Sequence, residues 1–216
     1  MTRAASMTTE STAWTIAAAP SGGGDPVAAA LLTFLDGVTF YRPKTVYVST
    51  PITTGPWFYE ELARRGAHGR IEDIESGLLD VVRDHAIAHN AAITAETIVE
   101  ANSRLPEHNF INPANLVVAT WSQAQYISFW LGFIERAAGQ VLLSPGWAYS
   151  TGCTHEFAKA VTDGLSVVDH TFAPLSLHDG LQHSRQAIAH IKELGLEPTS
   201  LMEAVEILSH ASGEAT

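Results

Sequence analysis

The chain has little of what several specialised classes of protein need. Its 216 residues include one cysteine, Cys153, so no disulfide within the chain is possible and no disulfide framework holds the fold together. Lys and Arg number 12 against 23 Asp and Glu, a formal net charge of −11. Binding to a long nucleic acid draws on clustered basic side chains to displace counterions, so this balance argues against a nucleic-acid partner.

Long hydrophobic runs are also missing. No apolar stretch approaches the roughly 20 residues that a membrane-spanning helix needs, so no membrane partner is expected. The N-terminus lacks the basic start and continuous apolar stretch of a signal peptide, which favours a cytoplasmic location. Residues 1–25 are rich in Ala, Ser, Thr and Gly and end in Ser21-Gly22-Gly23-Gly24, a composition typical of a disordered leader.

What remains, residues 26–216, is expected to form a single α/β domain. Its hydrophobic content, 46% for the whole chain, is sufficient for one sizeable core. Predicted strands alternate with predicted helices, which is typical of a parallel sheet. We expect the core at 44–169, a helical insertion at 56–105 after the first strand, and C-terminal helices within 179–210.

Helical patterns are expected at Pro26–Leu35, Trp57–Arg65, Ile71–Ser103, Trp121–Glu135, Asp179–Leu194 and Ser200–Leu208. The longest has an amphipathic face suited to cover the sheet edge or to pair with another subunit. The helix at Trp121–Glu135 carries several aromatic residues, which suits either packing in the core or a stacking wall for a nucleobase.

The most informative feature is Glu156. The run Val141–Leu143 predicts a buried strand, Pro145–Gly152 a turn-rich loop and Thr154–Thr162 a helix. Glu156 is therefore expected in the first helical turn after a strand, where open α/β sheets place their chemistry. The helix dipole there favours an ionised carboxylate, suited to act as a nucleophile. Acidic residues also occur in first turns because they complement the dipole, so position alone does not establish a function.

A second segment, Thr45–Gly55, reads as a β-branched strand that breaks into a loop of small hydroxyl residues. Together the two segments resemble the nucleoside 2-deoxyribosyltransferase-like superfamily, especially a branch of small domains. The branch carries an opening motif Tyr-x-Ser-x-Pro-Ile-Thr and a core motif Pro-Gly-Trp-x-x-Ser-x-Gly-x-x-x-Glu. The matching residues are Tyr47, Ser49, Pro51, Ile52 and Thr53 at the opening and Pro145, Gly146, Trp147, Ser150, Gly152 and Glu156 at the core.

The resemblance extends over roughly Lys44 to Asp169, and the stretch Asn109–Ala114 is similar to a short strand end of the same family. It implies a flavodoxin-like or Rossmann-like parallel sheet flanked by helices, without a cofactor. It also implies cleavage or transfer of the N-glycosidic bond of a nucleoside or nucleoside 5′-monophosphate. Water as acceptor gives a hydrolase, and a second base gives a transferase. Subunits of that family often complete one another's active sites, so a homo-oligomer is expected.

The family's nucleophilic glutamate falls on Glu156. Such a carboxylate captures C1′ covalently and splits one hard displacement into two easier steps. Tyr47 and Ser150 are expected to hold and orient the sugar or the carboxylate. The expected substrate-binding residues are Ser49, Thr53 and Gly55 around the sugar or phosphate, Trp147 against the base, and Pro51, Gly146 and Gly152 in the surrounding loops.

Two departures from the family pattern leave open a second functional class, a protein without catalytic activity. Ser150 stands where transferases often carry an aspartate, and Gly139 stands where the small-domain branch usually has one. A chain without these acids is also suited to be a non-catalytic nucleotide-binding or assembly module of the same fold.

Two other chemistries are weighed on the residues alone. Cys153 lies near a helix N-terminus beside His155, a setting that can lower a thiol's pKa, although cysteine is more often a buried filler. His85 and His89 share one helix face near Asp84 and have ligand spacing for zinc. No third ligand is clearly placed, so no metal is expected, and metal-dependent hydrolysis stands as a third alternative.

Overall fold

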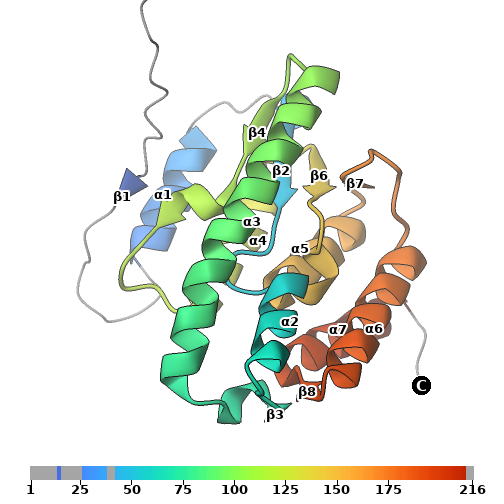
Figure 1. The fold of residues 1–216 in the computed structure, drawn as a ribbon. Coiled ribbons are helices and arrows are strands. Elements are labelled where there is room, and N and C mark those ends of the chain that lie inside the picture. Colours follow the sequence, from blue (N-terminus) through green and yellow to red (C-terminus); the bar gives the residue numbers. More distant parts are fainter. Residues whose placement is uncertain (1–13, 16–25, 38–41, 213–216) are drawn as a thin grey trace, which may run out of the picture.

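The computed structural model describes residues 14–15, 26–37 and 42–212 (Figure 1). Most of the expected leader, residues 1–13 and 16–25, lies outside the described residues.

The centre of the molecule is a sheet of four parallel strands in the order β4-β2-β6-β7. The strands are β2 (Thr45–Ser49), β4 (Asn109–Ile111), β6 (Gln140–Leu143) and β7 (Ser166–Asp169). Helices flank this sheet, and the chain between β2 and β4 is largely helical (Figure 1). The predicted α/β class, with a flavodoxin-like or Rossmann-like parallel sheet and a helical insertion after its first strand, is confirmed.

Seven α-helices are present in the described residues. They are α1 (Pro26–Gly37), α2 (Pro56–Arg64), α3 (Ser76–Arg104), α4 (Gln123–Ala137), α5 (Thr151–Thr162), α6 (Leu177–Glu193) and α7 (Thr199–Ser212). Short 3-10 turns lie at η1 (Arg42–Lys44), η2 (Ile71–Asp73), η3 (Pro113–Asn115) and η4 (Trp147–Tyr149). Two small parallel pairs join β1 (Trp14–Thr15) to β5 (Leu116–Val117) and β3 (Gly69–Arg70) to β8 (Leu196–Glu197).

The two faces of the sheet are buried against different helices. Successive strand residues point to opposite faces, so Val46 and Val48 pack towards α3, where they meet Ala101. Tyr47 points the other way, into the larger core that includes Ile134 of α4 and residues of α5, α6 and α7. In Figure 1 α3 lies in front of the sheet, and α4 and α5 lie behind it.

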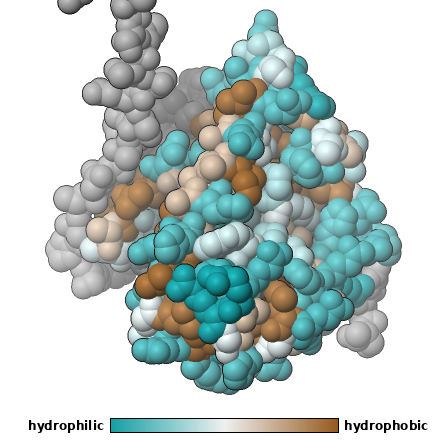
Figure 2. Space-filling view, in the orientation of Figure 1, coloured by the Kyte–Doolittle hydropathy of each residue, from teal (hydrophilic) through white to brown (hydrophobic). Residues whose placement is uncertain are grey.

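The surface that carries α2 and α3 is mainly hydrophilic, with smaller hydrophobic areas between (Figure 2). Exposed apolar side chains on α3 include Val81, Ile87 and Val99, which is 72% exposed. Among the described residues, none of the helices combines the length and the apolar character needed to cross a membrane.

The order of the strands creates a topological switch point between β2 and β6. The chain leaves β2 through α3 on one face to reach β4, and returns through α4 on the other face to reach β6. β2 and β6 are neighbours, so their carboxyl ends flank a topological switch point, where ligands bind in open α/β folds. There the backbone N–H of Ser144 donates to the carbonyl oxygen of Ser49 at 2.9 Å.

The expected long helix at Ile71–Ser103 begins later than predicted. Ile74 and Glu75 are extended, with ψ angles of 141° and 127°, and separate η2 from α3. The helix begins at Ser76, which places Gly77 in its first turn. Glycine destabilises the interior of a helix, so this position is less costly than one further along the predicted helix.

Candidate functional site

Glu156 lies on α5 with its carboxylate directed at β2. The hydroxyl of Tyr47 donates to Oε1 at 2.6 Å, and the hydroxyl of Ser49 donates to Oε2 at 2.6 Å. Tyr47 and Ser49 are two residues apart on one strand, so both point to the face that α5 covers. We call these three residues the Glu156 cluster. It joins the two sequence segments that carried the resemblance.

Burial dominates the ionisation of this carboxyl group. Glu156 is 7% exposed, and desolvation raises its pKa to about 7, although the bonds from Ser49 and Tyr47 lower it. The expectation that the helix dipole would hold Glu156 ionised is wrong. α5 begins at Thr151 rather than Thr154, so Glu156 lies in the second turn, beyond the turn where the dipole acts most strongly.

Tyr47 has no exposed surface. Burial, followed by the negative charge of Glu156, raises the pKa of its phenol well above the usual value, so the hydroxyl stays protonated and acts as a donor. Its ring packs against Trp130 and Phe133, with centroid distances of 5.6 and 6.1 Å. These contacts fix the position of the hydroxyl against Glu156.

Ser150 is brought near the cluster but not onto the carboxylate. Its hydroxyl caps α5 by accepting from the backbone N–H of Cys153 at 3.4 Å, and its carbonyl accepts from the Thr154 hydroxyl at 3.0 Å. Among the described side chains, Tyr47 and Ser49 are the ones that bond Glu156. The structure therefore shows Ser150 as the residue that starts the helix, and a direct role with substrate stays a prediction.

Cys153 is a buried neutral thiol in this structure. It is 2% exposed, and burial together with the charge of Glu156 raises its pKa to about 12. Contacts with Ser49 and Ser150 act in the opposite direction but do not prevail. The suggestion that the helix N-terminus would lower this pKa is wrong, because desolvation outweighs it.

Trp147 lies in η4, but its side chain belongs to the core. It is 5% exposed and packs against Phe157 at 5.0 Å and His183 at 6.3 Å between centroids. The next aromatic residue, Tyr149, shares a hydrogen bond of 2.9 Å with Nδ1 of His190 on α6. In the described structure Trp147 therefore helps to anchor the loop, and its contact with a base stays a prediction.

Two glycines allow the loops at the switch point to approach each other. Gly146 has a φ of +79°, and a Cβ there would lie 2.6 Å from Cδ of Pro56. Gly55 has a φ of +115°, and Asn90 crowds it on one side. Asn90 of α3 donates to the carbonyl oxygens of Ile52 and Thr54 at 3.0 and 2.5 Å. The loops after β2 and β6 are thus held together from both sides.

The other predicted binding residues lie in the loop after β2 and in the first turn of α5. Pro51 is buried beside Gly55, Thr53 is exposed, and Gly152 is half-buried in the first turn of α5. At the end of β4, Asn112 accepts from the backbone N–H of Ala114 at 3.0 Å and so caps η3.

Gly139 has a packing role that the sequence did not reveal. A Cβ at this position would lie 2.1 Å from the carbonyl oxygen of Arg42. The backbone of η1 thus passes too close for any side chain, which explains why an acid is absent where β6 begins.

The two histidines with zinc spacing lie on α3 and contact α2. His85 and His89 are exposed, and both rings contact Trp57, at centroid distances of 6.3 and 5.7 Å. Among the residues that the structure describes, no group of three or more His, Cys, Asp or Glu side chains is arranged to hold a metal ion.

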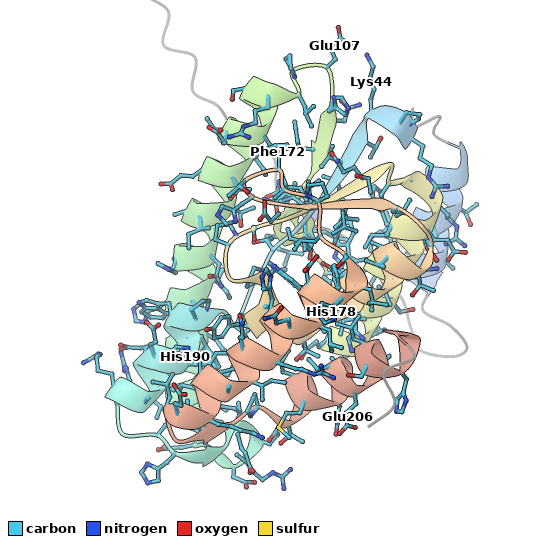
Figure 3. All side chains as sticks on the ribbon, turned by 90° about the vertical axis from the view of Figure 1, so that its right-hand side faces the viewer. Lys44, Glu107, Phe172, His178, His190 and Glu206 are labelled. Carbon is cyan, nitrogen blue, oxygen red and sulfur yellow. The ribbon has the colours of Figure 1, made fainter. Side chains whose placement is uncertain are left out.

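Two surface hollows lie on α6 and between α6 and α7 rather than at the switch point. Their linings include His178 and Gln182 in one, and Met202 and Glu206 in the other. Figure 3 shows His178 and Glu206 on these outer helices. The two hollows are formed by side chains of surface helices. Glu156 is instead a buried acid with a raised pKa, which is typical of functional sites, so the Glu156 cluster is the stronger candidate.

Sequence reasoning assigned Ser49 to a sugar or phosphate pocket and missed its bond to Glu156. The signal was available, since the spacing of two between Tyr47 and Ser49 places both on one face of the strand. Comparison of the chain with models of known families, with curated proteins and with solved structures gave no match.

Proposed function

We propose that this protein cleaves or exchanges the N-glycosidic bond of a nucleoside or nucleoside 5′-monophosphate, with Glu156 as the nucleophile. The observation that carries the proposal is the convergence of two hydroxyl donors, Tyr47 and Ser49, on a buried carboxylate from which they are 109 and 107 residues distant in sequence. The cluster lies beside the switch point between β2 and β6. The motif resemblance supports the same reaction.

The reaction proceeds in two displacements. A carboxylate oxygen of Glu156 forms a bond to C1′ while the N-glycosidic bond breaks, its electron pair leaves with the base, and the base takes up a proton. Water or a second base then attacks C1′, loses a proton, and releases the carboxylate. Tyr47 and Ser49 hold the carboxylate oxygens of Glu156 in place. Their hydroxyl groups stabilise the carboxylate anion before the first displacement and after the second.

Ionisation of Glu156 sets the working pH. Its pKa of about 7 means that the carboxylate and the acid are both populated near neutrality, and only the carboxylate attacks C1′. Tyr47 cannot compete as a base, because its own pKa is raised and its hydroxyl stays protonated.

The second candidate is a nucleotide-binding module without a reaction. One feature of the Glu156 cluster favours it. Glu156 is 7% exposed and both of its carboxylate oxygens already accept hydrogen bonds, as expected of a carboxyl group with a structural role. Such a protein would bind a nucleotide and be stabilised against heat, and would release no base.

The test is incubation of the purified protein with ribo- and deoxyribonucleosides and their 5′-monophosphates, with and without an acceptor base. Free base is measured by chromatography. Glu156→Gln should abolish release, and Glu61→Gln, which changes another buried glutamate, should not. Thermal stabilisation without release from any substrate would favour the binding module instead.

A further inference from the structure

Two buried indole N–H groups in the core lack an acceptor within the part of the chain that the structure describes. The indole N–H groups of Trp121 and Trp130 find no partner among the described residues, although the side chains are only 8% and 7% exposed. Leaving a buried donor unpaired costs about 1–3 kcal/mol, and nearly all buried donors in proteins are paired. The arrangement therefore points to an acceptor that the described residues do not supply.

These indoles belong to a chain of ring contacts that leads to the Glu156 cluster. Trp121 contacts Phe129 at 5.2 Å, Phe129 contacts Trp130 at 4.8 Å, and Trp130 contacts Tyr47 at 5.6 Å between centroids. Tyr47 in turn donates to Glu156. Trp130 is thus the unpaired donor in direct contact with a residue of the cluster, and Trp121 is two ring contacts further away.

Another unpaired group lies on the other side of the sheet. The hydroxyl of Ser144 is fully buried without a partner among the described residues. Ser144 follows Leu143, which faces the same core as Tyr47, so alternation directs Ser144 towards the α3 face. Trp130 contacts Tyr47 of the Glu156 cluster through its ring and is the better candidate for a ligand contact.

We propose that the indole N–H of Trp130 donates a hydrogen bond to the base of the substrate. The ligand class is a planar heterocycle with a carbonyl oxygen or an unprotonated ring nitrogen at its edge, which accepts this bond while its faces stack on neighbouring rings. The inference rests on the proposed function and adds a residue that recognises the leaving group. A donor there also stabilises the negative charge that the base gains as its bond to C1′ breaks.

Access to this donor requires movement of the rings around it. Trp130 is 7% exposed and has Phe129 and Phe133 as neighbours at 4.8 and 5.7 Å. A base reaches the N–H when these rings move apart. The hydrogen bond that the unpaired donor gains offsets part of the free energy of this movement.

The direct test uses the wild-type protein and observes the indole N–H groups of its 5 tryptophans by nitrogen-15 NMR. Uracil and hypoxanthine are the probes, and indole is the control because it is planar but offers no comparable acceptor. Trp130→Phe and Trp121→Phe assign the resonances. We expect both bases to shift the Trp130 resonance and indole to leave it in place. An unmoved Trp130 resonance, or an equal shift with indole, would overturn the proposal.

The variants give a second readout through affinity for the free bases, measured by calorimetry. Trp130→Phe keeps an aromatic ring but removes the donor, so affinity should fall about tenfold, as expected for one hydrogen bond. Trp121→Phe should bind as the wild type does. Equal affinity in all three proteins would contradict the role of Trp130.

Failure of this inference and failure of the proposed function can be told apart, because free bases bind without any reaction. Base release that depends on Glu156, with no effect of bases on Trp130, would reject only the role of Trp130. Base binding through Trp130 in a protein that cleaves no nucleoside would reject the glycosidic reaction and keep the recognition of a heterocycle.

Discussion

Glu61 on α2 and Glu156 on α5 have nearly the same exposed fraction, 8% and 7%, yet the groups that cover them differ, and so does the ionisation of their carboxyl groups. Arg64 and Arg65 bond the Glu61 carboxylate at 2.6 and 2.7 Å and lower its pKa to about 2. Glu156 has two hydroxyl donors instead of cations, and burial raises its pKa to about 7.

The contrast shows how the surroundings of a glutamate set the ionisation of its carboxyl group. Glu61 is an anion whose charge is balanced within one turn of its own helix, which suits a structural role. Glu156 is held in place by neutral groups from another element, so its charge is only partly compensated and it can change protonation near neutral pH. Perturbation of this kind at the carboxyl edge of a sheet is what a reactive acid requires.

The largest expected effect separates the two glutamates by activity. Glu156→Gln removes the proposed nucleophile and should lower base release by at least about a thousandfold, because covalent catalysis would be lost. Glu61→Gln should leave the rate within about threefold, since Glu61 bonds Arg64 and Arg65 at the end of α2 and does not contact the Glu156 cluster by a hydrogen bond. Steady-state rates measured by chromatography check this, and equal losses in both variants would show that burial alone explains the effect.

Stability as a function of pH sharpens the comparison further. The Glu156 pKa rises from 4.5 to about 7 on folding, so the folded state holds this proton more tightly. Its contribution to stability is present below pH 4.5 and is lost as the pH rises to about 7, a change of about 3 kcal/mol. Urea unfolding at pH 5 and pH 8 should show the wild type losing most of this free energy of unfolding relative to Glu156→Gln.

The Glu61 contribution has the opposite sign. Its pKa falls from 4.5 to about 2 on folding, so its stabilising effect is present above pH 4.5 and is lost as the pH falls to about 2. Glu61→Gln should therefore be less stable than the wild type at pH 7, and this difference should narrow in acid. A Glu61→Gln protein that gains stability relative to the wild type between pH 5 and 8 would contradict the contrast.

How much of this arrangement follows from the sequence depends on the range of the interactions. The strands at Val46–Val48 and Val141–Leu143 and the helix after them follow from apolar runs and turn residues, which are local. Convergence of Tyr47 and Ser49 on one strand face also follows from alternation. The pKa of Glu156 does not, because it depends on desolvation by α4, β2 and neighbouring elements that are distant in sequence.

The packing of Trp147 could not be predicted from its position in the sequence. The sequence placed it in a loop before the predicted nucleophile, and the structure adds that its ring is 5% exposed and packs on Phe157, while its contact with a base stays a prediction. The sequence left Trp130, like the other aromatic residues of Trp121–Glu135, open to core packing or to stacking with a base, because nothing in it tells whether a buried indole N–H will find an acceptor. Glycines at positions 139 and 146 were likewise explained only by the backbone and Pro56 beside them.

A smaller effect is expected at the loop that positions the cluster. Gly146→Ala should destabilise the fold by about 2 kcal/mol or more, because φ is +79° and the new Cβ would meet Pro56. Gly164→Ala is the matched control, with a φ of +70° and nothing within 4 Å, and should cost only about 1 kcal/mol for the backbone strain. Thermal unfolding compares them, and equal losses would show that the loop contact contributes nothing.

The smallest effect concerns the donors to Glu156. Tyr47→Phe removes one hydrogen bond and keeps the ring against Trp130, so the pKa of Glu156 should rise further and activity at pH 7 should fall about tenfold. The acidic limb of the pH–rate profile should move to higher pH. Tyr59→Phe alters another buried tyrosine, 4% exposed, and should leave that limb in place. A pH–rate profile unchanged by Tyr47→Phe would show that Tyr47 does not influence the pKa of Glu156.

The proposed covalent bond between Glu156 and C1′ is the step that most directly distinguishes a nucleophile from a buried structural acid. A 2′-fluoro nucleoside slows the second displacement by destabilising the oxocarbenium-like transition state, so the glycosyl-protein accumulates. Mass spectrometry of the intact protein and of its peptides should find the added fluoro-sugar on the peptide that contains Glu156. Base release from the same nucleosides with no adduct on that peptide, or an adduct that persists in Glu156→Gln, would contradict the mechanism.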